Sequence, residues 1–215
     1  MNWPRYAVYR FVVVLFISSQ LLVNTQALND SRDATNNTVL FLTNAERGQA
    51  NVFLAASQSL LKNYPSAEIH FATFPPLAGA VEAISERAHR PSGPGSITFH
   101  SLKGPTYLKK LADQGYQVQD LAHRPGLLGA SARLGIIPSL FIPWTGPEFV
   151  DIYDDVVRVI ESVRPDLVVV DSFFTPGHDA VRQLQMNHVV LSPNSIRDFI
   201  TIDQPRGEAF WKFPV

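Results

Sequence analysis

The chain has 215 residues, of which 46% are hydrophobic and 17% are charged, so we expect a packed core. Its 18 Lys and Arg nearly balance its 19 Asp and Glu, and no basic stripe is present, which argues against nucleic acid as a partner. Cysteine is absent, which excludes a disulfide scaffold, cysteine-ligated zinc and a cysteine nucleophile. The length suits one large α/β domain and is too short for two.

Residues 1–27 have the features of a secretory signal peptide. Arg5 and Arg10 precede the apolar run Phe11–Ile17, and Thr25–Ala27 offers small residues at the spacing that a signal peptidase prefers. The apolar run is short for a spanning helix, and an uncleaved membrane anchor is the alternative. We therefore expect the chain in the secretory pathway, in the lumen or membrane of the endoplasmic reticulum, or secreted.

A polar linker, residues 28–37, follows this segment. It carries two N-glycosylation sequons, which begin at Asn29 and Asn36. Sequons are common and chance is the alternative explanation, but two of them directly after a signal-like segment favour export.

From residue 38 onward, strand patterns and helix patterns alternate. Short apolar runs predict buried strands, namely Val39–Leu42, Glu68–Thr73, Ser96–His100, Leu167–Val170 and His188–Leu191. Helical spacing of apolar residues predicts helices, namely Gln49–Asn63, Leu77–His89, Tyr107–Ala112, Glu148–Val163 and Thr175 to about Gln185. This alternation predicts an α/β fold, with a Rossmann-like parallel sheet and flanking helices over residues 38–215.

Two segments need separate interpretation. Thr175 is expected to cap the last of these helices, with Pro176 at its first position, and another short helix is expected from Ser195. Leu127–Phe141 is apolar and rich in small residues. It is either a packing helix, a lining for an apolar substrate, or a face that contacts a membrane.

Candidate site residues follow from where ligands bind in open α/β sheets, beyond the carboxyl ends of the strands. Asp171 ends a buried strand and is either an acceptor for loop N–H groups or a catalytic carboxylate. Phe173 and Phe174 are either core residues or a ligand shelf. His178 lies in the first helical turn, where the dipole disfavours a charged ring, and is either a packed residue or a proton acceptor.

Several motifs with known chemistry are absent. The sequence has no G-x-S-x-G nucleophile elbow and no P-loop, and Gly93–Gly95 precedes a strand instead of following one. The histidines show no metal-ligand spacing, so no metal site is expected.

Two long segments resemble a known family. Val39–Leu61 (VLFLTNAERGQANVFLAASQSLL) resembles the opening strand, loop and helix of UDP-glycosyltransferases of the GT-B fold. Arg164–Phe199 resembles a later strand-loop-helix-strand of the same domain, and Gln204–Arg206 with Trp211–Pro214 is most similar to fungal members. The resemblance covers Val39 to the end of the chain and lies within the N-terminal, acceptor-side half of that family.

The resemblance implies a catalytic chemistry and a set of site residues. In the family a base takes the proton of an acceptor hydroxyl, which then attacks a UDP-sugar with inversion. That base is often a histidine after the first strand, oriented by an aspartate that Asp171 matches. Here the loop has no histidine: Gln49 aligns with it, and Glu46 is the one carboxylate, either a base or a solvated residue. The implied acceptor-binding residues are Asn44, Phe173, Phe174, His178 and Asn194.

The resemblance also implies partners. The acceptor would be a small apolar molecule such as a sterol, lipid or aromatic metabolite, with membrane association as a further expectation. A donor domain for the UDP-sugar would follow Val215, in the same chain or another, so we expect this chain alone to bind no cofactor and to be inactive. The alternative is a non-catalytic binding or partner protein that keeps the fold and pocket.

Overall fold

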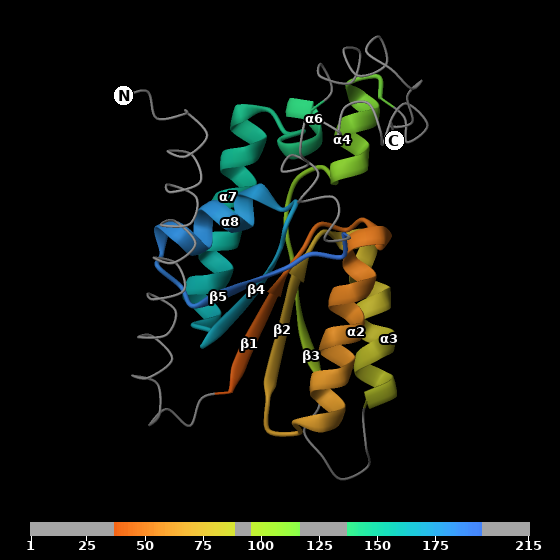
Figure 1. The fold of residues 1–215 in the computed structure, drawn as a ribbon, viewed down its shortest axis with the longest axis vertical. Helices are drawn as coiled ribbons and strands as arrows, with labels where there is room; N and C mark the ends of the chain where they lie inside the picture. Colours follow the sequence, from red (N-terminus) through yellow and green to blue (C-terminus); the bar gives the residue numbers. More distant parts are fainter. Residues whose placement is uncertain (1–36, 89–95, 117–136, 195–215) are drawn as a thin grey trace, which may run out of the picture. The chain divides into compact units, whose positions relative to one another are not determined.

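The computed structural model describes residues 37–88, 96–116 and 137–194 (Figure 1). The chain divides into two compact units, Met1–Asn36 and Asn37–Val215, and the described residues belong to the second. The expected signal or anchor, the sequons at Asn29 and Asn36, and the expected helix from Ser195 lie outside the described residues. Within them, no helix is long and apolar enough to cross a membrane.

Five parallel strands form one sheet in the order β3-β2-β1-β4-β5. Their bounds are β1 Thr38–Leu42, β2 Glu68–Thr73, β3 Ile97–Ser101, β4 Leu167–Asp171 and β5 His188–Leu191. The order changes direction at β1: the chain first adds β2 and β3 on one side of β1, and then adds β4 and β5 on the other side. The expected α/β fold with a parallel, Rossmann-like sheet is confirmed.

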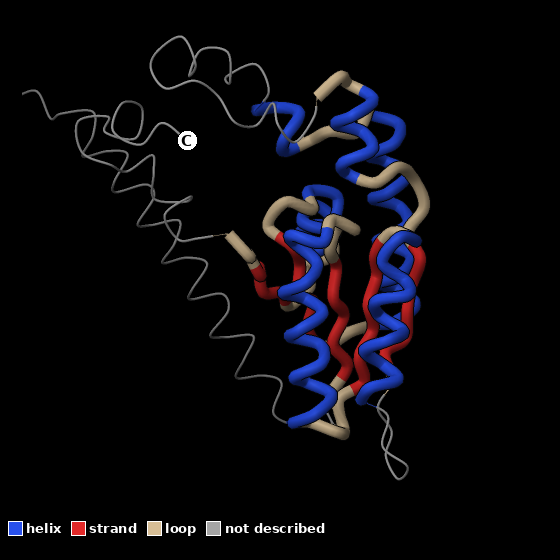
Figure 2. Tube along the Cα trace, turned by 90° about the vertical axis from the view of Figure 1, so that its right-hand side faces the viewer, coloured by secondary structure: helices blue, strands red, loops and turns tan. Residues whose placement is uncertain are grey.

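Helices connect the strands and cover both faces of the sheet (Figures 1 and 2). Their bounds are α2 Arg47–Asn63, η1 Pro75–Leu77, α3 Ala78–Ala88, α4 Tyr107–Asp113, α6 Ile137–Phe141, α7 Gly146–Val163 and α8 Thr175–Gln183. Phe53 of α2 meets Phe41 of β1 edge to face, so the odd-numbered residues of β1 point toward α2. The even-numbered Leu40 and Leu42 are also fully buried, on the opposite face, and α7 contacts β1 and β2.

The ends of the helices differ from expectation where side-chain chemistry acts locally. α7 begins before Glu148, because Thr145 and Glu148 form a capping box that starts the helix at Gly146. The expected cap at Thr175 is wrong. Phe174 occupies the N-cap position of α8, and the Thr175 hydroxyl instead donates to the backbone oxygen of Phe141, 3.2 Å away.

The segment Leu127–Phe141 is described only at its end. There Ile137–Phe141 forms the short helix α6, so a helix is present in that part. Phe141 and Ile142 are 48% and 53% exposed, which leaves this turn on the surface of the described structure. The rest of the segment lies outside the described residues.

Candidate functional site

The carboxyl ends of three neighbouring strands place three polar side chains side by side. Leu42 pairs with Ala72 of β2 and with Val170 of β4, so the next residues in register are Thr43, Thr73 and Asp171. These three residues are all 0% exposed. They share the sheet face of Phe41, which is the face covered by α2. A polar row therefore crosses the sheet beneath the start of α2.

Each carboxylate oxygen of Asp171 accepts a hydrogen bond. Its carboxylate accepts hydrogen bonds from the Thr43 hydroxyl at 2.8 Å and from the Phe173 backbone N–H at 3.0 Å. Burial raises the pKa of Asp171, while these hydrogen bonds and one from the Asn44 backbone act in the opposite direction. Asp171 thus ties the loop after β1 to the loop after β4, as the loop-acceptor interpretation requires.

The loop after β1 presents a second carboxylate. Asn44 is 1% exposed, and its side-chain oxygen accepts the Glu46 backbone N–H at 2.9 Å, which turns the chain into α2. Glu46 is half-buried and its carboxylate accepts the Leu108 backbone N–H at 2.9 Å. Burial raises the pKa of Glu46, and the bond from Leu108 only partly offsets this. A carboxylate with a raised pKa is suited to accept a proton near neutral pH.

Tyr107 is a site residue that the sequence did not indicate. Burial raises its pKa to about 12, and the nearby negative charges of Glu46 and Asp171 add to the effect. Its hydroxyl donates to the backbone oxygen of Leu140. Tyr107 therefore lies near both carboxylates, and its hydroxyl ties α4 to α6. No local sequence signal shows this, because the contact joins segments far apart in the chain.

Gln49 lies above the polar row. It is one turn before Phe53 on the same face of α2, roughly 6 Å nearer the carboxyl edge by helix rise. Thr43 is two residues beyond Phe41, an advance of roughly 6.6 Å along the strand. Because Phe53 packs on Phe41, Gln49 is on the sheet-facing side of α2, nearer the carboxyl edge that carries Thr43.

Two buried polar atoms at this place have no hydrogen-bond partner among the described residues. They are Gln49 Oε1 and Thr73 Oγ1. Buried polar groups in folded proteins are nearly always paired with protein, water or ligand. Gln49 Oε1 is a hydrogen-bond acceptor, and the Thr73 hydroxyl can donate or accept. The O–H group of a ligand or a water could therefore pair with either atom.

The two phenylalanines after Asp171 have different surroundings. Phe174 is 0% exposed and packs edge to face on Phe74 and Trp144, so it is a core residue. Phe173 is half-buried and stacks on Phe141 with ring centroids 5.6 Å apart. The Phe173–Phe141 pair presents an aromatic surface beside the carboxyl edge.

His178 and Asn194 lie at the margin of the site. Burial is the largest effect lowering the pKa of His178, and the nearby charge of Arg182 acts in the same direction. The Ser172 hydroxyl donates to the Ser192 oxygen at 3.1 Å, which also accepts the Asn194 backbone N–H at 3.3 Å. These contacts join the loops after β4 and β5. Within the described ranges, no group of three or more His, Cys, Asp or Glu residues is arranged to hold a metal ion.

Comparison with known proteins gives similarity of architecture at low identity. No family model matches the chain, and no curated protein matches it. Among solved structures, three glycosyltransferases are similar: the calicheamicin enzyme CalG4 (16% identity, TM-score 0.46), SnogD from Streptomyces nogalater (21%, 0.46) and VinC in complex with DTDP (14%, 0.47).

These matches cover 82%, 74% and 81% of this chain, but only 41%, 36% and 41% of the solved structures. The chain thus spans about two fifths of their length. Scores this low carry no argument about function, and the fold is established by the sheet itself.

Proposed function

We propose that this chain is the acceptor-side part of a sugar-nucleotide-dependent glycosyltransferase. The observation that carries the proposal is that two carboxylates, Asp171 and Glu46, both act on Tyr107 at the carboxyl edge of a parallel sheet, where Gln49 Oε1 has no partner among the described residues. This is the edge at which open α/β folds bind their ligands. The sequence resemblance of Val39–Leu61 to UDP-glycosyltransferases supports the same assignment.

The proposed reaction gives each residue a role. In the bound state the acceptor hydroxyl donates its one O–H to Gln49. For the reaction this O–H turns to the carboxylate of Glu46, which removes the proton, since an amide has no useful basicity. The acceptor oxygen forms a bond to the anomeric carbon as the bond from that carbon to the nucleotide diphosphate breaks. The proton goes to the Glu46 carboxylate. Asp171 acts as a positioning residue, because its carboxylate is occupied by Thr43 and backbone N–H groups.

We propose a small apolar acceptor with at least one hydroxyl group. The Phe173–Phe141 pair provides an aromatic surface, and Phe141 is 48% exposed. A flat or apolar body stacked there would carry its hydroxyl toward Gln49. Sterols, lipids and aromatic metabolites all belong to this class. Export through the secretory pathway and membrane association remain proposals that rest on residues 1–27.

The donor is proposed to be a UDP-sugar held by a second, donor-side domain. The family resemblance of residues 39–215 is to the acceptor half alone, so we expect this chain by itself to bind UDP-glucose weakly and to transfer no sugar. Calorimetric titration with UDP-glucose tests this point. Micromolar affinity of the isolated chain would contradict it.

A non-catalytic binding protein is the second candidate function. Gln49 favours it, because the resembled family carries a histidine at the corresponding place. The acceptor site is then kept for binding alone. Both candidates predict acceptor binding, and only the catalytic one predicts turnover when a donor-side domain is supplied and its loss in Glu46→Gln.

The test of the shared site is a binding comparison between naphthol and naphthalene. These probes have the same apolar body, and only naphthol carries a hydroxyl. We expect naphthol to bind more tightly, Phe173→Ala to weaken both probes, and Thr73→Val or Gln49→Leu to abolish the preference for naphthol. Equal binding of both probes to the unaltered chain would contradict the proposal.

Phe174→Ala serves as the matched control for Phe173→Ala. Removing a fully buried phenylalanine costs about 3–5 kcal/mol of folding free energy. The half-buried Phe173 should cost much less. The proposal fails if Phe173→Ala unfolds the protein as readily as Phe174→Ala, because the ring would then be a core residue.

A further inference from the structure

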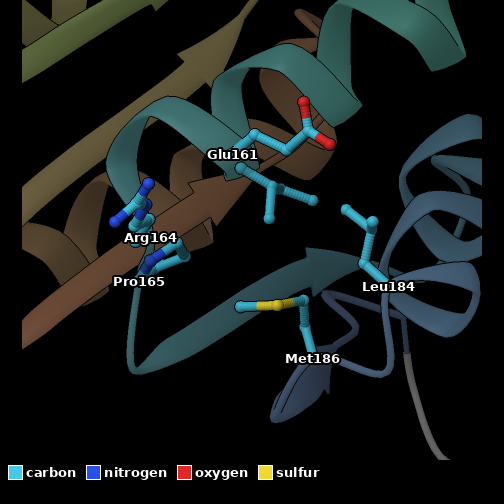
Figure 3. Close-up of a pocket in the computed structure, with 6 residues that line it drawn as sticks. Glu161, Arg164, Pro165, Leu184 and Met186 are labelled. Atoms are coloured by element: carbon cyan, nitrogen blue, oxygen red, sulfur yellow. The ribbon is translucent and has the colours of Figure 1, made fainter.

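A cavity lies at the opposite end of β4 from Asp171. It has a volume of about 600 Å³ and lies between the end of α7 and the segment from α8 to β5 (Figure 3). This volume falls within the range of small-molecule sites. Its six lining residues are Ile160, Glu161, Arg164, Pro165, Leu184 and Met186. None of them takes part in the site proposed above.

The cavity combines an apolar floor with a charged rim. Ile160 is 2% exposed and Pro165 is buried, while Leu184 and Met186 are half-buried and line the opposite wall. Arg164 and Glu161 are exposed, and neither forms an ion pair within the part of the chain that the structure describes. Figure 3 shows the Glu161 carboxylate turned away from Arg164, so the two charges stand at separate places on the rim.

Two residues with an unusual backbone conformation lie at this cavity. Arg164 and Gln185 are the non-glycine residues with positive φ in the described ranges, each with a φ of 51°. Each follows the end of a helix, α7 or α8, at a position that glycine usually occupies. Residues other than glycine, asparagine and aspartate are disfavoured in this conformation. Both exceptions therefore flank one cavity, and one of them carries the guanidinium at its rim.

We propose that this cavity binds a small amphipathic anion. The apolar body of the ligand contacts Ile160, Leu184 and Met186, and its anionic group is bound by the Arg164 guanidinium. Guanidinium presents paired N–H donors that match carboxylate and phosphate oxygens. A ligand charged at one end avoids Glu161, because that carboxylate lies apart from Arg164.

Calorimetric titration of the full chain tests the proposal with four probes built on a ten-carbon chain, each kept below its micelle concentration. Decanoate and decyl phosphate carry an anionic group, decanol is neutral, and decyltrimethylammonium is cationic. We expect saturable binding of one or both anions, and at least about tenfold weaker binding of decanol and the cation, since charge-assisted hydrogen bonds contribute that much. Whichever anion binds more tightly identifies the headgroup.

Two glycine variants provide a matched pair. Arg164→Gly removes the guanidinium and relieves the positive φ, so the fold should be kept while anion affinity falls at least about tenfold. Gln185→Gly relieves the same conformation without loss of charge and should leave affinity unchanged. Arg164→Gln, which keeps a polar side chain but removes the positive charge, should weaken binding like Arg164→Gly.

Three results would overturn the proposal. They are the absence of saturable anion binding, equal affinity for decanol and decanoate, and an Arg164→Gly variant that folds and binds the anions as well as the unaltered chain. Because naphthol binding is measured at the other end of β4, failure here leaves the proposed acceptor site untouched.

Discussion

The hydroxyl of Thr43 donates a 2.8 Å hydrogen bond to the buried carboxylate of Asp171, which lies 128 positions later in the chain. This bond joins β1 to β4 across the centre of the sheet, where the strand order changes direction. It holds together the loops that carry Glu46 and Phe173. The proposed site is therefore built on a connection between two sheet strands and not on a flexible loop alone.

Asp171→Asn should destabilise the fold by about 1–3 kcal/mol, because the new NH₂ group would face donors that now bind a carboxylate. The effect should depend on pH. Burial raises the pKa of Asp171 above its ordinary value of 3.8, so its contribution is fully present below 3.8 and is lost as pH rises through the folded-state pKa. Chemical denaturation of both proteins across this range should show the unaltered chain losing stability relative to Asp171→Asn. A difference that is constant with pH would contradict the raised pKa.

Glu46 should titrate above its ordinary value of 4.5, because its carboxylate is half-buried. Carbon-detected NMR titration of the side-chain carboxyl measures this directly. If Glu46 is the base, turnover with a donor-side domain should rise with pH through the same pKa, since only the ionised carboxylate accepts a proton. Glu46→Gln should then lower turnover about 10²–10⁴-fold. A titration at or below 4.5 would remove the basis for this role.

Gly177 in α8 should tolerate no side chain. A Cβ there would lie 2.7 Å from Cδ1 of Phe174 and 3.1 Å from Cγ2 of Val170, both in the core. Gly177→Ala should therefore cost about 1–3 kcal/mol of folding free energy through overpacking. Gly48 in α2 is the control: a Cβ there meets nothing within 4 Å, so Gly48→Ala should stabilise the helix by up to about 1 kcal/mol. Thermal denaturation of the two variants should move in opposite directions, and a shift in the same direction would contradict the packing described.

The edge formed by β2 and β3 should respond to acid. His70 Nδ1 and His100 Nε2 are 2.8 Å apart and the rings are stacked, so two protons cannot be accommodated between them. Burial, and then the neighbouring His70, lower the pKa of His100 below 6.5. Its neutral form therefore contributes stability that is present above pH 6.5 and is lost as pH falls toward the lowered pKa. His100→Gln should reduce this dependence in denaturation measured between pH 7 and 5, and an unchanged profile would contradict it.

The sequence predicted the ends of the five strands to within one residue, because short apolar runs such as Leu167–Val170 are typical of strands buried on both faces. Helix ends were predicted less well. The cap of α8 was missed, because the Thr175 hydroxyl bonds to the backbone of Phe141, a contact between segments that local patterns do not connect. The composition of the site had the same limit for Tyr107, which joins the site only through tertiary packing.

Adjacent aromatic residues show this limit clearly. Phe173 and Phe174 have the same chemistry and neighbouring positions, so the sequence left both the core and the ligand-shelf interpretations open for each. The turn after β4 directs Phe174 into the core against Trp144 and leaves Phe173 half-buried against Phe141. Such a choice depends on the direction of each Cα–Cβ bond in the folded chain.

The central claim, that the carboxyl edge of the sheet binds a hydroxylated apolar acceptor, is tested most directly by mapping amide NMR shifts during a naphthol titration. The account predicts saturable shifts concentrated at Asn44, Gln49, Thr73 and Phe173, with Arg164 and Met186 unaffected. Shifts confined to Arg164 and Met186, or no saturable shift at the carboxyl edge, would contradict it.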